Sequence, residues 1–540
     1  MLRGPLLFFR IVSIYLGSIN LKNKSMKKIT FGCIILVLIF SCKKEISTTP
    51  NNGTVPRTVT EIDYYVNGGS GSDANTGTSA AHPLKTIQAA LNKTTEGGYS
   101  TIYVAGGTYG ERLVWPHSGA SEDERITLTN YNDGVVILDG SLTTSSTQNA
   151  MIEVTSKSYL TIENINIINN IRNDAYGIYI HGSGTFVDVT DCKIHHIGWT
   201  TDSTAVPTST QNAHPFLLIG STTASYNEVY VGSNEIYSCN TGYSEALTMN
   251  GNVEVFLIEL NTVHHIRNIG IDVAGHYSWT GAPAASNYVR DGNIKYNTVY
   301  NCVSNVATNG GIYADGASYV NIEGNICHDN YAGITVGCEN NGFTAQHIRV
   351  SSNFVYNNKD AAIIIGSNQA SSKVTYSSVN NNTFFKNFTN GGYGGEISLQ
   401  NTDHLSIQSN IVQSASNIVV IALLGYTSTN LSMDYNRYYT LSGSSGTITF
   451  DWGGINGGGY YSLATFQSGT GLDAHSTYGT PSFVNSTLAT LNLHLTSGSA
   501  CVNAGYPSYV VDTNDDETDV DQQNRVQNSR IDIGADETPY

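Results

Sequence analysis

The chain has 540 residues, of which 13% are charged and 54 are glycine, and its formal net charge is −17. That length exceeds one ordinary globular core, yet the chain lacks the helical periodicity of several α/β domains. The acidic balance argues against a nucleic-acid partner, because phosphate binding needs a basic face. An acidic polysaccharide would likewise need a local Arg/Lys cluster or a bridging Ca²⁺.

A targeting segment is expected at Met26 to Cys42, which reads MKKITFGCIILVLIFSC. A short basic start precedes an apolar run that is too short to span a membrane, and a Cys stands at its end. The segment resembles the lipoprotein signals of Bacteroidota, in which Cys42 would be acylated after cleavage. That resemblance implies export, an outer-membrane location facing the periplasm or the cell surface, and a lipid anchor as the only membrane contact. Residues 1–25 are expected to be a mis-assigned extension or a long n-region.

A polar tether, residues 43–60, is expected to lead into the folded part. The run HPLKTIQAALNK then predicts a short helix opened by Pro83, with Ile87, Ala90 and Leu91 on one face. Glycines punctuate the first strand-like runs after it. One short amphipathic helix in front of a stack of strands closes the open end of a solenoid.

A ladder of Asn residues follows, with spacings of 27, 36, 28, 28, 29 and 28 residues. A nearly fixed period of this size in a chain of short strand-like runs is typical of stacked coils, each burying its apolar face on its neighbours. At equivalent corners, Asn side chains can hydrogen-bond up the stack and satisfy backbone groups of the turns. The members of the ladder are Asn234, Asn261, Asn297, Asn325, Asn353, Asn382 and Asn410.

One strand of each coil begins with Gly or Ala and then alternates aliphatic and other residues. Period-two alternation places the aliphatics inside the cylinder and the intervening side chains on its outer face. Two insertions, at about 198–215 and 277–291, are expected to form loops on one face, often the binding face, and aromatic loops commonly stack on sugar rings. Their notable residues are Trp199, Tyr277, Trp279 and Arg290.

From about Tyr64 to Leu424 the chain resembles the pectate-lyase-like superfamily of secreted β-helix proteins, including the lyases of family nine. The predicted fold is an all-β, right-handed parallel β-helix of about 12 coils over residues 61–424, with an N-terminal capping helix. Residues 425–540, where the period fades, resemble the β-rich C-terminal cap of such proteins. Their acidic stretch from Asp512 to Asp521 is either a solvated loop or a Ca²⁺ site. A monomer is expected.

Aligning the strand starts gives a map of the outer face. Its three columns are Asp272, Tyr313 and Thr335; Asn250, Asp315 and Gly337; and Asn252, His276 and Glu339. Coils lie about 4.8 Å apart and alternate residues about 6.6 Å apart, so Asp315 and Glu339 should have Cβ atoms roughly 8 Å apart. Side-chain reach then covers both the retaining and the inverting arrangements of glycoside hydrolysis.

Neighbouring carboxylates raise one another's pKa, so that one can act as an acid while another stays ionised. The alternative is that these acidic side chains only keep a flat β face soluble. We expect Asp315 and Glu339 to be the catalytic pair, with Asp272 as modulator or alternate partner. The substrate-binding candidates are Glu245, Asn250, Asn252, His276, Trp279, Arg290 and Tyr313.

The runs SEALTMNGN, NTVHHIRNIGIDVAGH and GGIYADG resemble a subset of β-helix proteins from polysaccharide-degrading bacteria. By position, that resemblance implies a site made of Glu245, Asp272, Arg290, Asp315 and Glu339. Against the family-nine lyases, IRNIGID stands where those enzymes resemble NSDDGFD, with several Ca²⁺-binding carboxylates. Tyr313 lies near the place where their Lys base is expected. These departures argue against a Ca²⁺-dependent, Lys-based elimination.

Three functions remain open at this stage. The leading one is a surface-anchored enzyme that hydrolyses glycosidic bonds of a polysaccharide and requires no cofactor. The second is β-elimination on a uronate polymer, with Arg290, Lys295 or His276 acting at C5, Tyr313 as acid, and Glu245 and Asp272 holding Ca²⁺. The third is a glycan-binding surface protein without catalysis.

The cysteines and histidine pairs of the coils are expected to be structural. No spacing among them suggests zinc, and Cys at a corner usually serves as a small buried apolar residue. The histidines are expected to be turn residues with rings pointing in different directions. These residues are Cys192, Cys239, Cys302, Cys327, His195, His196, His264 and His265.

Overall fold

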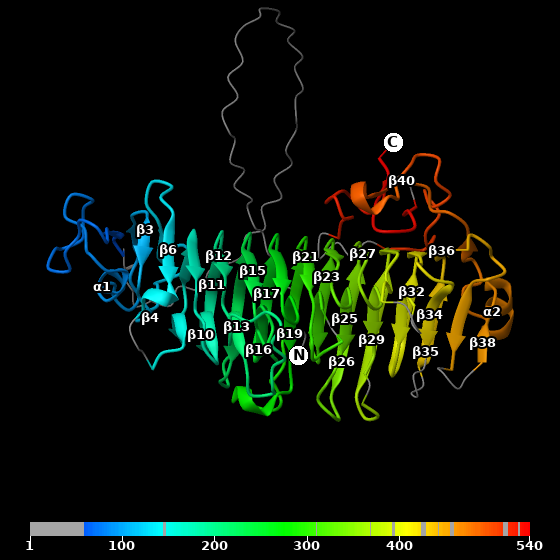
Figure 1. The fold of residues 1–540 in the computed structure, drawn as a ribbon, viewed down its shortest axis with the longest axis horizontal. Coiled ribbons are helices and arrows are strands. Elements are labelled where there is room, and N and C mark those ends of the chain that lie inside the picture. The colour runs from blue at the N-terminus through cyan, green and yellow to red at the C-terminus, as the bar shows by residue number, and fades with distance from the viewer. Residues whose placement is uncertain are drawn as a thin grey trace, which may run out of the picture. The chain divides into compact units, whose positions relative to one another are not determined.

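The computed structural model describes residues 59–143, 147–308, 310–367, 369–390, 395–422, 428–440, 442–453, 458–510, 517–527 and 530–539. The predicted targeting segment with Cys42 and most of the tether lie outside these residues. In the described part, strands form three sheets of 13 strands each, side by side along the long axis (Figure 1). Every strand pair in these three sheets is parallel except β37 with β38, at the end of one sheet. The predicted parallel β-helix is confirmed, with about 13 coils.

The three sheets take successive strands of each coil. Sheet I contains β1 (Ile62–Val66), β2 (Ser100–Val104), β5 (Ile126–Asn130), β8 (Leu160–Glu163), β11 (Gly184–Thr190), β14 (Tyr226–Gly232), β17 (Val253–Glu259), β20 (Arg290–Lys295), β23 (Ser318–Glu323), β26 (Thr344–Ser351), β29 (Lys373–Asn380), β32 (Thr402–Gln408) and β35 (Thr429–Asp434). Sheet II contains β3 (Gly107–Tyr109), β6 (Val136–Asp139), β9 (Ile165–Ile168), β12 (Lys193–His195), β15 (Glu235–Cys239), β18 (Thr262–Ile266), β21 (Thr298–Cys302), β24 (Ile326–His328), β27 (Phe354–Tyr356), β30 (Thr383–Phe385), β33 (Ile411–Gln413), β36 (Arg437–Tyr439) and β39 (Thr477–Tyr478). Sheet III contains β4 (Leu113–Trp115), β7 (Ala150–Thr155), β10 (Ala175–Gly182), β13 (Ala213–Gly220), β16 (Leu247–Gly251), β19 (Ile271–Ala274), β22 (Ile312–Asp315), β25 (Ile334–Gly337), β28 (Ile363–Ile365), β31 (Ile397–Leu399), β34 (Ile418–Ala422), β37 (Thr449–Trp452) and β38 (Gly458–Tyr460). The remaining elements are α1 (Ile87–Leu91), η1 (Gly140–Leu142), η2 (Ser278–Thr280), α2 (Leu463–Thr470), η4 (Leu488–Thr490), β40 (Phe483–Asn485) and β41 (Asn492–Leu495).

Aliphatic side chains stacked in register fill the cylinder. In sheet III, Ile271, Ile312, Ile334 and Ile363 lie at equivalent positions of successive strands, and none is more than 1% exposed. Burying such a side chain contributes roughly 1.5–3 kcal/mol relative to leaving it in water. Repetition of this contact from coil to coil is what holds the register that positions the outer-face residues.

The Asn ladder lies at the corner between sheets I and II and is confirmed. Each member donates its backbone N–H to Oδ1 of the next member, at 2.8–3.1 Å, and the last, Asn410, donates in the same way to Asn436. The side-chain amide of a member donates to one carbonyl of the coil before it and to one of its own coil, as Asn353 does to Ile322 and Ser351. Buried backbone groups that the strands leave unpaired are thereby satisfied.

The helix predicted near Pro83 is α1, and its buried residues are the predicted Ile87, Ala90 and Leu91. It begins at Ile87 and not at Pro83. The backbone N–H groups before it bond to Asp73, and Thr86 serves as N-cap by accepting from the backbone N–H of Ala89. Side-chain capping therefore fixes the start of the helix.

The stack extends beyond residue 424, where the sequence period weakens. Strands β35, β36 and β37 continue the three sheets, and the last parallel pair is β36 with β39, which ends at Tyr478. Residues beyond it fold back on the coils: the backbone N–H of Ala535 donates to Thr383, and Asn381 donates to the carbonyl of Asp532 (Figure 1). The C-terminal region thus belongs to the same unit as the coils.

The described cysteines are all free and buried, as expected for apolar corner residues. Among the helices of the described residues, none has the length and apolar character needed to cross a membrane.

Candidate functional site

A cluster of polar residues lies on the outer face of sheet III, over strands β16, β19, β22 and β25. Strand register places Asp272, Tyr313 and Thr335 in one column and Asn250, Asp315 and Gly337 in the next, as the sequence alignment of coils predicted. Every residue of these four strands is buried, on the outer as well as the inner face. The insertion between β19 and β20 covers this part of the outer face, since Tyr277 of that insertion contacts the cluster.

Two carboxyl groups share one phenol at the centre of the cluster. The hydroxyl of Tyr277 lies 2.6 Å from Oδ2 of Asp315 and 3.3 Å from Oε2 of Glu339. Asp315 also accepts at Oδ1 from the backbone N–H of Glu339, at 2.8 Å, and from the hydroxyl of Tyr313, at 3.4 Å. Asp315 is 1% exposed, whereas Glu339 faces solvent. The buried carboxylate is thus held in one orientation beside an accessible one.

Burial raises the pKa of all four carboxyl groups in the cluster, and repulsion from neighbouring carboxylates adds to this for Glu245, Asp272 and Asp315. Burial, with the charge of Glu339, raises the pKa of Asp315 to about 7, and burial raises the pKa of Glu245 to about 8. Burial together with the charges of Glu245 and Asp315 raises the pKa of Asp272 well above its usual value. The pKa of Glu339 is also raised, chiefly by burial. Near neutral pH the cluster therefore shares protons and titrates as a set.

A buried His beside Glu245 is uncharged at neutral pH. The Nδ1 atom of His214, in β13, lies 3.9 Å from Oε2 of Glu245. Burial lowers the pKa of His214 to about 3, so this ring does not neutralise the carboxylate. Glu245 instead accepts a hydrogen bond from Thr248 at 3.3 Å. His214 therefore acts on Glu245 as a neutral ring.

Several polar atoms of the site have no partner in the described residues although they are buried. They include Oδ1 of Asn250, Oδ1 of Asp272 and Oγ1 of Thr335. Such atoms are rare in folded proteins and call for an explanation, often a functional one. A ligand that carries several hydroxyl groups supplies the donors and acceptors that these atoms lack.

Two predicted binding residues lie outside the cluster. Arg290 begins β20 of sheet I, where it bonds to Glu254 at 2.5 Å and to Oδ1 of Asn252 at 3.1 Å. Asn252 donates to the carbonyls of Thr222 and Thr223. The structure places them outside the cluster because the chain turns the corner to sheet I immediately after β16, which sequence spacing alone does not reveal. Both residues stabilise that corner.

Lys295, one of the cations proposed for an elimination reaction, also lies outside the cluster. Lys295 ends β20 of sheet I, is 9% exposed and lies 3.4 Å from Glu323. The third candidate, His276, lies in the covering loop, stacked on Phe343 with ring centroids 4.2 Å apart. Burial lowers its pKa, so His276 is neutral near pH 7. Trp279, 59% exposed, lies beside Tyr277 in the same loop.

Three residues of the cluster were missed in the sequence. Tyr277 was noted only as an aromatic residue of an insertion, because its contact with Asp315 depends on how that loop folds back. Thr248 shares the column of Asp272 and was detectable from the coil alignment. His214 lies one coil before Glu245, as the pairing of Phe216 with Leu247 shows. Extending the alignment by one coil reveals His214.

The fold resemblance raised the question of Ca²⁺ at Glu245 and Asp272. In the described residues, one trio of His, Cys, Asp and Glu brings its ligand atoms within 4.8 Å of one another: His494, Asp521 and Asp536, in the C-terminal region. The four carboxyl groups of the cluster form no such trio, and Ca²⁺ takes six to eight oxygen ligands. The cluster does not fit a preformed Ca²⁺ site. Of the predicted acidic stretch, residues 512–516 lie outside the described part.

Comparison with known proteins identifies a family. The chain is 30% identical over 435 residues to the uncharacterized protein YwoF of Bacillus subtilis strain 168, which covers 78% of this chain and 88% of YwoF. The chain belongs to the YwoF family. Because the name of that relative states no activity, family membership assigns none. No model in the collection of protein families matches the chain.

Solved structures similar to this member of the YwoF family have low identities. Pectate lyase Pel9A aligns at TM-score 0.47 and 15% identity, covering 89% of this chain and 97% of Pel9A. XylC in complex with xylose aligns at TM-score 0.47 and 12% identity, covering 70% of this chain and 84% of XylC. PfbA, a surface adhesin of Streptococcus pneumoniae, aligns at TM-score 0.43 and 13% identity, covering 69% of this chain and 89% of PfbA. At these scores the likenesses carry no argument about activity.

Proposed function

We propose that this protein is a glycoside hydrolase that cleaves a polysaccharide with retention of anomeric configuration. The observation that carries the proposal is the hydroxyl of Tyr277, which contacts carboxyl oxygens of both Asp315 and Glu339. Two oxygens bound to one hydroxyl at these distances lie at most about 6 Å apart, which is compatible with the ~5 Å separation of the carboxyl groups in retaining enzymes.

The surroundings of the two carboxyl groups suit different roles. Asp315 receives hydrogen bonds from Tyr277, Tyr313 and the backbone of Glu339, and these donors favour its ionised form. Asp315 is therefore the nucleophile that attacks the anomeric carbon. Glu339 faces solvent, and we assign to it the acid/base role, in which its protonated form protonates the leaving oxygen and its ionised form then deprotonates the incoming water.

The remaining members of the cluster support this pair. The pKa of Glu245, raised to about 8, keeps that group largely protonated at neutral pH, and the raised pKa of Asp272 favours its protonated form, so both limit the negative charge around Asp315. Their protonated carboxyl groups, with Asn250 and Thr335, present hydrogen-bonding groups to sugar hydroxyls. The exposed Trp279 lies at the edge of the covering loop, where an aromatic ring can stack on a sugar.

Elimination on a uronate polymer receives less support. That reaction needs a cation to neutralise the uronate, and the candidate cations Arg290 and Lys295 lie on sheet I beside Glu254 and Glu323. A cluster of carboxyl groups also repels a uronate. A solely adhesive role does not account for buried carboxyl groups with raised pKa values, which destabilise the fold.

The proposal is tested with a panel of plant and algal polysaccharides. Hydrolysis releases new reducing ends without the ultraviolet absorbance of an unsaturated uronate, and proton NMR of the first product reports its anomeric configuration. Absorbing products would replace hydrolysis by elimination, and an inverted product would exclude the nucleophile role of Asp315. Binding without turnover across the panel would favour an adhesive protein.

We further propose export and acylation at Cys42, from the segment that begins at Met26. Incorporation of labelled palmitate into the wild type but not into Cys42→Ser is the expected result. Equal labelling of both proteins would contradict it.

A further inference from the structure

A hollow lies at the corner where the chain passes from sheet II to sheet III. It has a volume of about 540 Å³, and Asn240, Arg267 and Val303 are among its lining residues. The coils that supply them are those that continue into Glu245, Asp272 and Asp315. The hollow and the carboxylate cluster are therefore built from the same coils, on either side of a corner of the β-helix. Its size is that of a small-molecule site.

Positive charge gathers in this hollow. Arg267 and Lys359 line it, together with His196 and His265, and no Asp or Glu is among its lining residues. In the part of the chain that the structure describes, neither Arg267 nor Lys359 has a side-chain hydrogen bond or ion pair. Lys193 of the same sheet, by contrast, is bound to Glu235 at 2.7 Å. In a protein of net charge −17, an unpaired cationic hollow attracts an anion.

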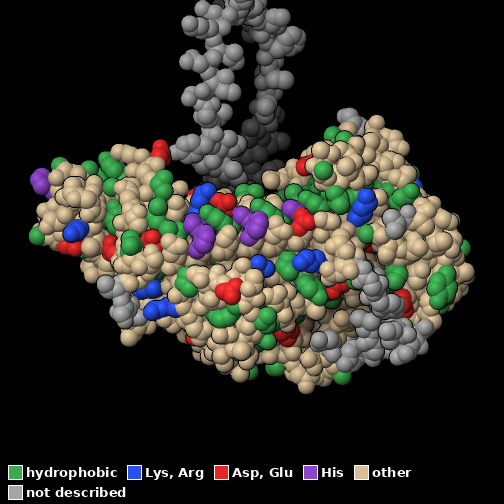
Figure 2. All heavy atoms as spheres, viewed as in Figure 1, with side chains coloured by type: hydrophobic (Ala, Val, Ile, Leu, Met, Phe, Trp, Pro, Cys, Tyr) green, Lys and Arg blue, Asp and Glu red, His purple; other side chains and the backbone are tan. Residues whose placement is uncertain are grey.

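A ladder of stacked rings positions the two histidines. On the outer face of sheet II, His and Tyr alternate from coil to coil with ring centroids 4.5–5.1 Å apart; the rings are His195, Tyr237, His264, Tyr300, His328 and Tyr356. His196 and His265 each stand edge-on to the ladder ring before them, with Nδ1 atoms 2.7 Å apart. His195, His264 and His265 are strand residues and not the predicted turn residues, and His196 directly follows β12, although the paired rings do point in different directions. Figure 2 shows His side chains gathered on this face, with Lys and Arg next to them.

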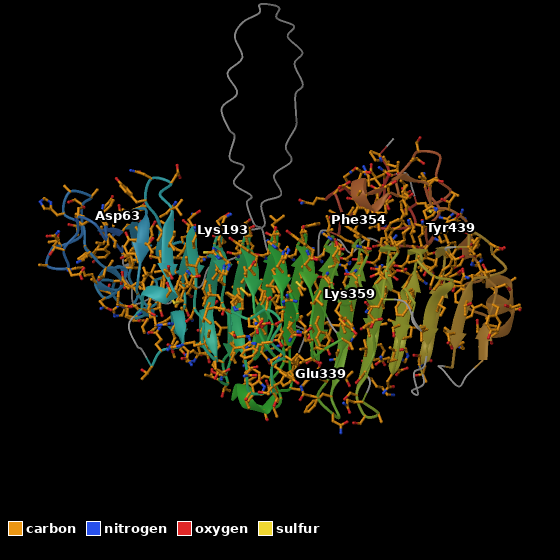
Figure 3. All side chains as sticks on the ribbon, in the orientation of Figure 1. Asp63, Lys193, Glu339, Phe354, Lys359 and Tyr439 are labelled. Atoms are coloured by element: carbon orange, nitrogen blue, oxygen red, sulfur yellow. The ribbon has the colours of Figure 1, made fainter. Side chains whose placement is uncertain are left out.

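The floor and the rim of the hollow differ in polarity. Ile197 and Ile266, both at most 1% exposed, form part of its floor, while Thr200 and Thr201 contribute hydroxyl groups. A sugar ring has a matching character, with an apolar face and a rim of hydroxyl groups. In Figure 3, Glu339 lies closer than Lys359 to the lower edge of the stack, as expected if hollow and cluster occupy different faces.

We propose that this hollow binds the acidic group of a glycan, a uronate carboxylate or a sulfate ester, through Arg267 and Lys359. The inference rests on the proposed function only in taking the ligand to be a glycan. The carboxylate cluster repels an acidic sugar and the hollow attracts one, so the two together favour a polysaccharide that contains both neutral and acidic units. The neutral unit occupies the cluster and the acidic unit the hollow.

Calorimetric titration of the whole protein tests the inference. Two pairs of probes are compared, each an acidic glycan and its neutral match. They are trigalacturonate with its methyl ester, and a sulfated carrageenan tetrasaccharide with its desulfated form. At least one acidic probe should bind about tenfold or more tightly than its neutral match, and more weakly as salt rises. The probe that binds distinguishes uronate from sulfate ester. Equal binding of acidic and neutral probes, or equally effective competition by inorganic sulfate, would overturn the proposal.

Variants locate the binding. Arg267→Gln and Lys359→Gln should each weaken the acidic probe about tenfold, while Lys193→Gln, which removes a paired Lys of the same sheet, should not. Circular dichroism confirms that the exposed substitutions leave the fold intact. Asp315→Asn should retain binding of the acidic probe whether or not it cleaves, so failure of the hydrolase proposal and failure of this one are distinguishable. Unchanged affinity in both Gln variants would refute the site.

Discussion

Two stacks of polar side chains run along the same β-helix and differ in how well they are satisfied. In the Asn ladder, Asn353 alone donates to the carbonyls of Ile322 and Ser351 and to Oδ1 of Asn382, and it accepts from the backbone N–H of Asn325. In the carboxylate cluster of sheet III, atoms of Asn250, Asp272 and Thr335 have no partner in the described residues. Both stacks arise from the same repetition of coils.

The difference separates structural from functional burial. A buried polar group costs little when its hydrogen bonds are made, and the Asn ladder meets this condition at every coil. Like charges packed together without a neutralising group cost stability, as the raised pKa values of Glu245, Asp272 and Asp315 show. Such an arrangement persists where chemistry requires it. Substitutions in the two stacks should therefore act on different properties.

Replacing the nucleophile should act on activity and leave the fold intact. Asp315→Asn retains the size and the hydrogen-bond acceptor of the side chain but cannot attack the anomeric carbon. We expect cleavage to fall by about 10²–10⁴-fold, as measured by reducing ends at saturating substrate. Thermal unfolding should occur at the same temperature or higher, because one charge of the cluster is removed.

The matched control is Glu153→Gln, on β7 of the same sheet, where Glu153 lies 3.4 Å from His181. This variant should cleave at the rate of the wild type. An Asp315→Asn protein that folds and still cleaves normally would remove Asp315 from the mechanism.

Breaking the Asn ladder should act on stability. Asn353→Ala leaves buried backbone groups of two coils without partners, so the free energy of unfolding should fall by about 2–4 kcal/mol. Denaturant titration measures this loss, and the activity of the remaining folded protein should be unchanged. Asn227→Ala, which removes an outer-face amide that donates a long hydrogen bond of 3.5 Å to Ser225, should cost far less. Equal losses in both variants would contradict the structural role of the ladder.

The sequence predicted the fold because the repeat is visible in it. Coil period, inward aliphatics and the Asn corner all follow from one repeated physical requirement, and the columns of Asp272 and Asp315 follow from the register that this repeat sets. The same logic missed the end of the stack, since strands continue to Tyr478 where loops of unequal length hide the period. The extent of the stack can be predicted from the sequence only where the coils have similar lengths.

Positions that depend on irregular segments could not be predicted. Tyr277 reaches Asp315 only because the insertion after β19 folds back over sheet III. Arg290 ends that insertion and enters sheet I, so its distance along the sequence gave no indication of its pairing with Glu254. The site thus combines residues of the repeated strands with residues of a loop, and sequence spacing predicts the positions of the strand residues only.

Removing the shared hydroxyl should have a smaller effect than removing the nucleophile. Tyr277→Phe takes away the donor to Asp315, and a hydrogen bond to a charged group contributes about 1.5–3 kcal/mol, so cleavage should fall roughly 10- to 100-fold. Since this donor lowers the pKa of Asp315, its loss should move the acidic limb of the pH–rate profile to higher pH. Tyr237→Phe, in the ring ladder of sheet II, is the control and should move neither. An unshifted profile in Tyr277→Phe would exclude its role in stabilising the ionised Asp315.

The smallest effect expected is a pH-dependent gain in stability from Glu245→Gln. Burial raises the pKa of Glu245 from 4.5 to about 8, so between these values the unfolded chain releases a proton that the folded protein keeps. Folding therefore loses stability as pH rises through this window. The Gln variant lacks this loss. It should match the wild type near pH 4 and exceed it by on the order of 2 kcal/mol near pH 8, whereas Glu122→Gln, at an exposed position, should show no such divergence. Parallel stability curves for wild type and Glu245→Gln would mean that Glu245 is ionised in the folded protein, and the cluster would then hold fewer protons than its hydrogen bonds and burial require.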